Sequence, residues 1–184
     1  VLIDTTYNEF DPQKIYVDAY PIEILPSTTR APLVNKAIDE SLKNGAFIVN
    51  YTGHGNEHQW ANSNIFNEDM IESLSNEPLL PLFVTATCEF GRHDNTSDIS
   101  GGEELVVMPY HGAIGLITTS RPVFATTNYA LNLAFYNAVF SKENGKYKTL
   151  GEIFAETKNN SLNGVNNRNF SLLADPSLKL AYPE

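Results

Sequence analysis

Three short apolar segments, separated by longer segments with helical periodicity, restrict the fold of this chain most strongly. They cover residues 46–51, 80–87 and 113–119, and each is apolar along most of its length, which is typical of a strand buried on both faces. A strand, a helix and a second strand form the unit of a right-handed crossover between parallel strands. The pattern therefore predicts an α/β fold, with a mainly parallel sheet flanked by helices.

Further elements are predicted around these segments from periodicity and from residues that begin or end helices. Helices are expected over 31–43, 67–74, 100–107, 128–140 and 149–158. Their expected N-terminal caps are Thr28 with Thr29, Asn67, Ser100 and Thr149, and Gly45 is the expected stop of the first helix. A strand is expected over 15–17 with Tyr20, two extended pieces over 170–180, and a surface loop over the Asn-rich segment 159–169.

Length and composition restrict the class of protein. The chain has 184 residues, of which 42% are hydrophobic, so we expect one globular domain. A net charge of −10 repels a phosphate backbone, so we expect no nucleic-acid partner. No apolar stretch approaches the roughly 20 residues of a spanning helix, so no transmembrane segment is expected. The chain begins with Val1 and not with methionine, and we interpret residues 1–184 as a single domain of a longer, multidomain protein.

Two residues with catalytic chemistry follow the first two apolar segments. Segment 46–51 runs into a Gly-His-Gly turn that contains His54, and segment 80–87 runs directly into Cys88, the only cysteine. Ligands bind at the carboxyl ends of strands in open parallel sheets, so we expect both residues at one edge. A thiol beside an imidazole is the minimum machinery for thiolate catalysis. The backbone N–H groups of Gly55 and Cys88 could stabilise an oxyanion there.

Each of these signals has a plainer interpretation on its own. A cysteine that ends an apolar strand is usually a small buried hydrophobe, and a histidine in a turn is usually structural. Segment 54–58 also fits H-x-x-E-H, the inverted zinc-protease motif. That motif needs a helix, and the segment contains glycine and asparagine, which are poor helix formers. Zinc catalysis is therefore a remote alternative.

Charged residues after Cys88 leave two further interpretations open. Arg92 either brings a positive charge to a Cys88 thiolate, if the chain folds back, or forms an ion pair with Asp94. Acidic side chains in the same region offer oxygen ligands for a structural calcium ion, although their spacing is not that of an EF-hand. A solvated acidic face is the default interpretation of this run. The acidic residues are Asp94, Asp98, Glu103 and Glu104.

Taken together, these motifs resemble the gingipain family of caspase-like cysteine peptidases, and within it the sortases of the type IX secretion system. The most specific stretch is GHGNEHQW at 53–60, in which a tryptophan follows the histidine by six residues. The other similar stretches are NYTGHG at 50–55, TATCEF at 85–90, Arg92 with Asp94, SGGE at 100–103, TTSRPV at 118–123 and LLADP at 172–176. The resemblance extends over nearly the whole chain from Ile15 onward.

The resemblance implies a caspase-like three-layer sandwich that carries a Cys–His dyad. Cys88 would be the nucleophile and His54 the general base and later acid, and the backbone N–H groups of Gly55 and Cys88 would form the oxyanion hole. Side chains expected to contact substrate or wall the cleft are Glu57, Trp60, Glu89, Ser120 and Arg121. No cofactor or catalytic metal is implied. The resemblance also implies an upstream α/β subdomain whose carboxylate orients the histidine, so these residues alone are expected to be weakly active or inactive.

The resemblance further implies a polypeptide substrate and a location outside the cytoplasm. The expected activity is that of a cysteine endopeptidase or sortase, and the expected substrate is the C-terminal secretion signal of type IX cargo, transferred to water or another acceptor. Other secretion-system components are expected partners, at the outer membrane or cell surface of a Bacteroidetes-type bacterium. A second hypothesis from a different class is a non-catalytic interaction domain that keeps the fold. The reactivity of the Cys88 thiol distinguishes the two.

Overall fold

A four-stranded sheet forms the centre of the computed structural model, which describes residues 6–7, 10–161 and 164–183. The strands lie in the order β3 (Ile48–Thr52), β4 (Leu82–Ala86), β5 (Gly115–Thr119) and β8 (Phe170–Leu173). The first three strands are parallel, and β8 pairs with β5 in the antiparallel direction. The mainly parallel sheet predicted from the three apolar segments is therefore confirmed.

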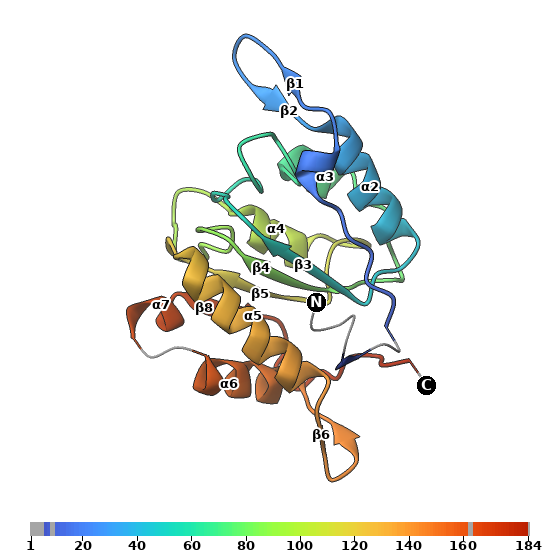
Figure 1. Cartoon of the computed structure of the whole chain (residues 1–184), viewed down its shortest axis with the longest axis vertical. Coiled ribbons are helices and arrows are strands. Elements are labelled where there is room, and N and C mark those ends of the chain that lie inside the picture. The colour runs from blue at the N-terminus through green and yellow to red at the C-terminus, as the bar shows by residue number, and fades with distance from the viewer. Residues whose placement is uncertain (1–5, 8–9, 162–163, 184) are drawn as a thin grey trace.

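Helices cover both faces of this sheet and make three layers (Figure 1). On one face lie α2 (Pro32–Lys43), α3 (Glu68–Glu72) and α4 (Gly101–Val107), and on the other lie α5 (Ala125–Val139) and α6 (Leu150–Asn160). Strand β4 supplies both cores, because side chains alternate along a strand. Phe83 packs against the first group of helices, whereas Leu82 and Val84 pack against the second.

Three of the four predicted helix caps form hydrogen bonds. The Asn67 side chain accepts from Met70 N, while Ser100 and Thr149 each form a reciprocal capping box with the glutamate three residues later. A side-chain oxygen at this position satisfies an N–H group that would otherwise lack a partner. The cap predicted from Thr28 and Thr29 is wrong. Instead, β2 (Thr29–Arg30) pairs with β1 (Glu23–Ile24), and α2 begins with a proline in its first turn.

The strand predicted over 15–17 is also wrong. Ile15 and Val17 are partly buried against the core beneath α2, but this segment leads into η1 (Val17–Ala19), a single 3-10 turn. Apolar alternation here reflects packing on a helix and not strand pairing. In the Asn-rich segment the structure contains α7 (Val165–Arg168), and residues 162–163 of that segment lie outside the described residues.

A short hairpin lies away from the central sheet. Strands β6 (Lys142–Glu143) and β7 (Lys146–Tyr147) form a hairpin whose two turn residues, Asn144 and Gly145, both have positive φ. Of the two extended pieces predicted over 170–180, the first is β8. Among the described residues, no helix is long and apolar enough to cross a membrane.

Candidate active site

The register of β3 and β4 brings the two predicted catalytic residues to equivalent positions at one edge of the sheet. Thr52 is paired with Ala86, and His54 and Cys88 are each the second residue after these partners. A further hydrogen bond, from Gly53 N to Ala86 O at 3.5 Å, carries the contact between the strands past the end of β3. Neighbouring strands lie about 4.8 Å apart. The backbones of His54 and Cys88 therefore leave the sheet side by side.

The turn that follows β3 is held by hydrogen bonds to the His54 carbonyl oxygen. Tyr51 Oη and Ala61 N each donate to it at 2.7 Å, and the His54 side chain is exposed. Burial raises the pKa of Tyr51 to about 12, which keeps its hydroxyl protonated as a donor. Gly55 lies against the strand that ends in Cys88, because a Cβ added at Gly55 would be 2.5 Å from Thr87 Oγ1.

Trp60 lies beneath this turn, so the prediction that it walls the cleft needs correction. Its side chain is only 2% exposed and stacks between Tyr51 and Phe66, with ring centroids 4.4 and 4.2 Å away. Its backbone N–H donates to Ile65 O at 2.8 Å, which closes the loop. A large aromatic ring in this position supports the histidine turn from the core.

Cys88 is half-buried, so the interpretation of it as a fully buried hydrophobe does not apply. Its Sγ lies 3.7 Å from Val123 O, in the segment that connects β5 to α5. The next residue, Glu89, has a φ of +56°, in the left-handed region that few non-glycine residues adopt. The chain therefore turns sharply immediately after the thiol, which lies between the ends of β3 and β5.

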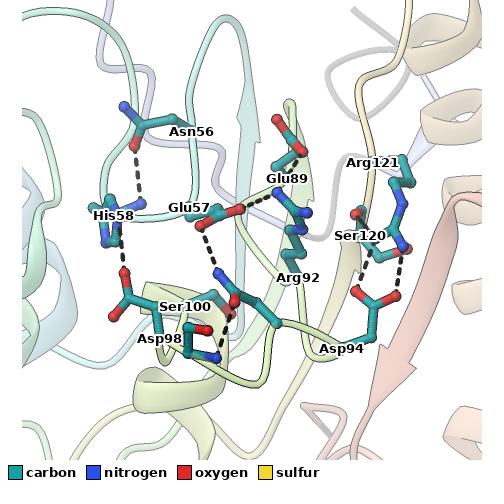
Figure 2. A network of polar contacts seen from close by, with 12 residues as sticks. Asn56, Glu57, His58, Glu89, Arg92, Asp94, Asp98, Ser100, Ser120 and Arg121 are labelled. Atoms are coloured by element: carbon teal, nitrogen blue, oxygen red, sulfur yellow. Dashed lines mark hydrogen bonds and ion pairs between the residues drawn. The ribbon is translucent and has the colours of Figure 1, made fainter.

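An ion-pair network joins the loops after β3 and β4 (Figure 2). Arg92 Nη1 lies 2.5 Å from Glu57 Oε1 and 3.3 Å from Glu89 Oε1. Asn95 Nδ2 donates to the other Glu57 oxygen at 3.2 Å, and the Glu57 carbonyl accepts from Gly101 N at 2.8 Å. Two carboxylates offset the charge of Arg92, so we infer that its main role is to hold these loops together. The contact of Glu57 or Glu89 with substrate stays a prediction.

The turn after β5 carries the second ion pair. The two Nη atoms of Arg121 lie 2.5 and 2.8 Å from the carboxylate oxygens of Asp94, which corrects the predicted pairing of Asp94 with Arg92. The hydrogen bond from Arg121 lowers the pKa of Asp94 to about 2. Ser120 is anchored through hydrogen bonds from its N and Oγ to Asn169 O. Substrate binding by Ser120 and Arg121 stays a prediction.

The helix required by the zinc motif is absent, because residues 54–58 form a turn. His58 does not face His54: its Nδ1 lies 2.6 Å from Glu68 Oε1 and its Nε2 lies 3.5 Å from Asp98 Oδ2. Ligand atoms of Glu57, His58 and Asp98 all lie within 4.8 Å of one another, but both Glu57 oxygens already accept hydrogen bonds. The arrangement therefore fits a charged bridge between loops better than a zinc centre.

The acidic run considered for calcium is divided among separate partners. Asp94 pairs with Arg121, Asp98 faces His58, and Glu103 caps α4 through Ser100. Because each of these three carboxylates has a separate partner, the three do not converge as the oxygen cage that calcium requires.

One cavity of about 450 Å³ lies along the outer edge of β3, where Tyr51 and Trp60 from beneath the histidine turn also line it. Its lining includes Ile38 and Leu42 of α2 together with Phe47 and Val49, and neither His54 nor Cys88 contributes to it. It is mostly apolar space between α2 and β3. The candidate active site is therefore defined by the strand ends and not by this cavity.

Comparison with protein families identifies the family of this chain. The profile of peptidase family C25 matches residues 2–181, which is nearly the whole chain. This chain belongs to peptidase family C25. No curated protein matches it in sequence.

Solved structures similar to this C25 chain include gingipains. The crystal structure of the Arg-specific cysteine proteinase gingipain R (RgpB) has a TM-score of 0.71 and 20% sequence identity. The complex of Porphyromonas gingivalis RgpB pro- and mature domains has a TM-score of 0.66 and 19% identity, and each comparison covers 79% of this chain. This chain corresponds to 36% and 37% of those two proteins. The fold of the C25 chain is thus the caspase-like gingipain fold. The chain spans about a third of the length of these two solved proteins.

Two polar side chains that hold the end of β4 in this C25 chain were missed by the sequence analysis. Asn128 Nδ2, from α5, donates to Ala86 O at 2.8 Å, and Thr119 Oγ1, from β5, donates to Thr87 O. Both residues are buried in apolar segments, at 5% and 0% exposure. A buried polar residue within an apolar run is the available signal, because such a group needs a partner.

The His58 bridge predicts a pH-dependent stability for the C25 chain. The hydrogen bond that the His58 ring donates to the Glu68 carboxylate raises the pKa of His58 above the unfolded value of about 6.5. The contribution of the protonated His58 to the free energy of unfolding is therefore complete below pH 6.5, and it is lost as the pH rises through the folded pKa. We expect His58→Gln to lower the melting temperature by about 2 °C at pH 5.5, since exposed pairs contribute less than about 1 kcal/mol. The difference from wild type should shrink at alkaline pH.

Melting curves between pH 5 and 9 test this prediction. His93→Gln is the matched control, because His93 is exposed in a loop and its Nδ1 contacts the Gly91 carbonyl oxygen, not a carboxylate. A difference between His58→Gln and wild type that stays constant with pH would contradict the charged bridge.

Proposed function

We propose that this chain is the dyad-bearing part of a gingipain-like cysteine peptidase, with Cys88 as the nucleophile and His54 as the general base and acid. The single observation that supports this most is the register of β3 and β4, which puts the two residues at equivalent positions beyond Thr52 and Ala86. Membership of peptidase family C25 is independent support for a polypeptide substrate. The dyad chemistry needs a thiolate and an imidazole across one gap.

The proposed reaction is acyl transfer. Cys88 Sγ attacks the scissile carbonyl carbon and forms a thioester as the peptide C–N bond breaks. His54 takes the thiol proton and gives it to the leaving amine. Water or another nucleophile then breaks the thioester and regenerates the thiol. The backbone N–H groups of Gly55 and Cys88 are the proposed donors to the oxyanion that forms before each bond breaks.

We further propose that the substrate is the C-terminal secretion signal of type IX cargo, as for the sortase PorU. The support is the set of sequence motifs at 53–60, 85–90 and 118–123 that resembles these sortases. If the chain is such a sortase, it acts outside the cytoplasm and contacts other secretion components, and we propose both. Glu57, Glu89, Ser120 and Arg121 are the proposed substrate-facing side chains, at the loops that surround Cys88.

The experiment uses the full-length protein and a soluble cargo that ends in such a signal, with and without an added amine acceptor. Mass spectrometry is expected to detect release of the signal and, with the amine present, cargo carrying the acceptor. Cys88→Ala should give neither product. Cleavage that persists in Cys88→Ala would overturn the dyad. Hydrolysis of general peptides without preference for the signal would overturn the sortase assignment alone, and a folded but inert protein would favour the interaction-domain hypothesis.

A further inference from the structure

We propose that Thr119 is a positioning residue that aims the backbone N–H of Cys88 at the oxyanion. The inference rests on the proposed function, because the oxyanion hole belongs to that reaction. It begins from the direction of two consecutive carbonyl groups at the end of β4. Ala86 O accepts from Gly53 N, on the β3 side, whereas Thr87 O accepts from Thr119 Oγ1, on the β5 side.

Peptide geometry converts this hydrogen bond into an orientation for Cys88. The C=O and N–H of a trans peptide point in opposite directions within one plane. The carbonyl of Thr87 and the N–H of Cys88 belong to the same peptide unit. When Thr119 holds that carbonyl toward β5, the Cys88 N–H points toward β3. The histidine turn lies on that side, since a Cβ on Gly55 would touch the Thr87 side chain.

The main chain of β5 does not provide this orientation. The ladder between β4 and β5 pairs three residues of each strand and ends at Val84 with Ile117. Beyond that point the two strands are joined by side-chain hydroxyls. Thr85 Oγ1 donates to Thr118 Oγ1 at 2.7 Å, and Thr119 Oγ1 donates to Thr87 O. The second of these contacts acts on the peptide unit that contains the Cys88 N–H.

The surroundings of Thr119 favour a fixed and not a fluctuating contact. Both Thr119 and Thr87 are 0% exposed, so water does not compete for the Thr87 carbonyl. The Thr119 carbonyl accepts from Gly91 N at 3.0 Å, so the same residue also anchors the loop that follows Cys88. A preorganised donor in a dry environment is what oxyanion stabilisation requires.

The experiment compares three variants of the full-length protein: Thr119→Val, Thr119→Ser and the matched control Thr118→Val. The control removes a buried hydroxyl one residue away, whose partner is Thr85 and not the Cys88 peptide unit. We expect Thr119→Val to lower kcat by about 10- to 100-fold with little change in KM, because a misdirected oxyanion donor affects the transition state. Thr119→Ser should recover most of the loss, and Thr118→Val should keep kcat within about twofold of wild type.

Two further measurements separate this role from a general loss of structure. A peptide aldehyde forms a tetrahedral adduct whose oxygen occupies the oxyanion position, so Thr119→Val should weaken its binding in parallel with kcat. Alkylation by iodoacetamide forms no oxyanion, so its rate at Cys88 should stay unchanged. If the valine variant does not fold, as judged by melting, Thr119→Ala replaces it, because alanine adds no atoms.

Equal losses of kcat in Thr119→Val and Thr118→Val, or failure of serine to rescue, would overturn the proposal. So would an alkylation rate that falls together with aldehyde binding, since that would indicate displacement of the thiol itself. Failure of the proposed function has a different signature, because activity would then either persist in Cys88→Ala or be absent from the folded wild-type protein.

Discussion

Replacing Cys88 with alanine is expected to abolish peptide-bond cleavage, and replacing His54 with alanine to reduce it by about 10²- to 10⁴-fold. Alanine at position 88 removes the only thiol and with it the acyl intermediate. Loss of His54 removes the group that accepts and returns the proton, and general acid–base catalysis contributes a factor of this size. Neither change should affect folding strongly, since His54 is exposed and Cys88 is half-buried.

Alkylation of Cys88 tests the same pair without a substrate. If His54 accepts the thiol proton, His54→Ala should slow the reaction with iodoacetamide at pH 7 by about tenfold, because the thiolate is the reactive form. His93→Ala is the control, as it removes another exposed histidine only five residues from the thiol. Equal alkylation rates in wild type, His54→Ala and His93→Ala would contradict the dyad.

The positions of His54 and Cys88 can be predicted from sequence, because each residue follows the end of a strand. Segments 46–51 and 80–87 are apolar enough to be recognised as strands. Strand β4 lies within the second segment and is buried throughout, as predicted. Strand β3 runs one residue past the first segment and, as an outer strand of the sheet, has no fully buried residue, so its predicted burial is wrong. Once two such strands are parallel neighbours, the residues that follow them must share an edge. The placement of His54 and Cys88 at that edge was therefore accessible from local pattern alone.

The loop contacts around the site were not accessible in the same way. Arg92 has carboxylates within reach at several sequence separations, and the partner that it adopts depends on how three loops fold together. Arg92 pairs with Glu57, 35 residues away, and with Glu89, whereas the neighbouring Asp94 pairs with Arg121. The predicted position of the Trp60 side chain differs from the structure for another reason. Its position after the histidine suggested a cleft wall, but an aromatic ring of that size gains more from burial beneath the turn.

The antiparallel strand β8 shows the limit of the periodicity argument. The sequence predicts extended structure over 170–180, and β8 does pair with β5, from Leu116 with Leu173 to Thr119 with Phe170. Its direction depends on the connection through α6 and α7, not on its own composition. Thr119 is thereby held between β8 on one side and the end of β4 on the other. Local sequence pattern therefore predicts the strands but not this junction, on which the proposed oxyanion geometry depends.

Replacing Gly55 with alanine is expected to lower activity by about 10²-fold and stability by about 1–3 kcal/mol. The added Cβ would lie 2.5 Å from Thr87 Oγ1 and 2.9 Å from Gln59 O, both closer than carbon atoms normally approach. Overpacking of this kind is relieved by a backbone shift. The shift would separate the histidine turn from the strand that ends in Cys88, and a displacement of about 1 Å between reacting groups can cost two orders of magnitude in rate.

A double-mutant cycle tests this steric argument. Thr87→Ala removes the closer of the two contacts, and Thr87 Oγ1 has no hydrogen-bond partner among the described residues, so this change alone should cost little. Gly55→Ala combined with Thr87→Ala should recover part of the lost activity and stability, whereas contact with the Gln59 carbonyl oxygen limits full recovery. Gly145→Ala is the control, because a Cβ there meets nothing within 4 Å and only the left-handed φ of the β6–β7 turn is disturbed. Additive effects of the Gly55 and Thr87 changes would show that the histidine turn and the end of β4 do not press on one another at this point. The hydrogen bond from Gly53 N to Ala86 O would then be the contact that holds the turn beside the strand that ends in Cys88.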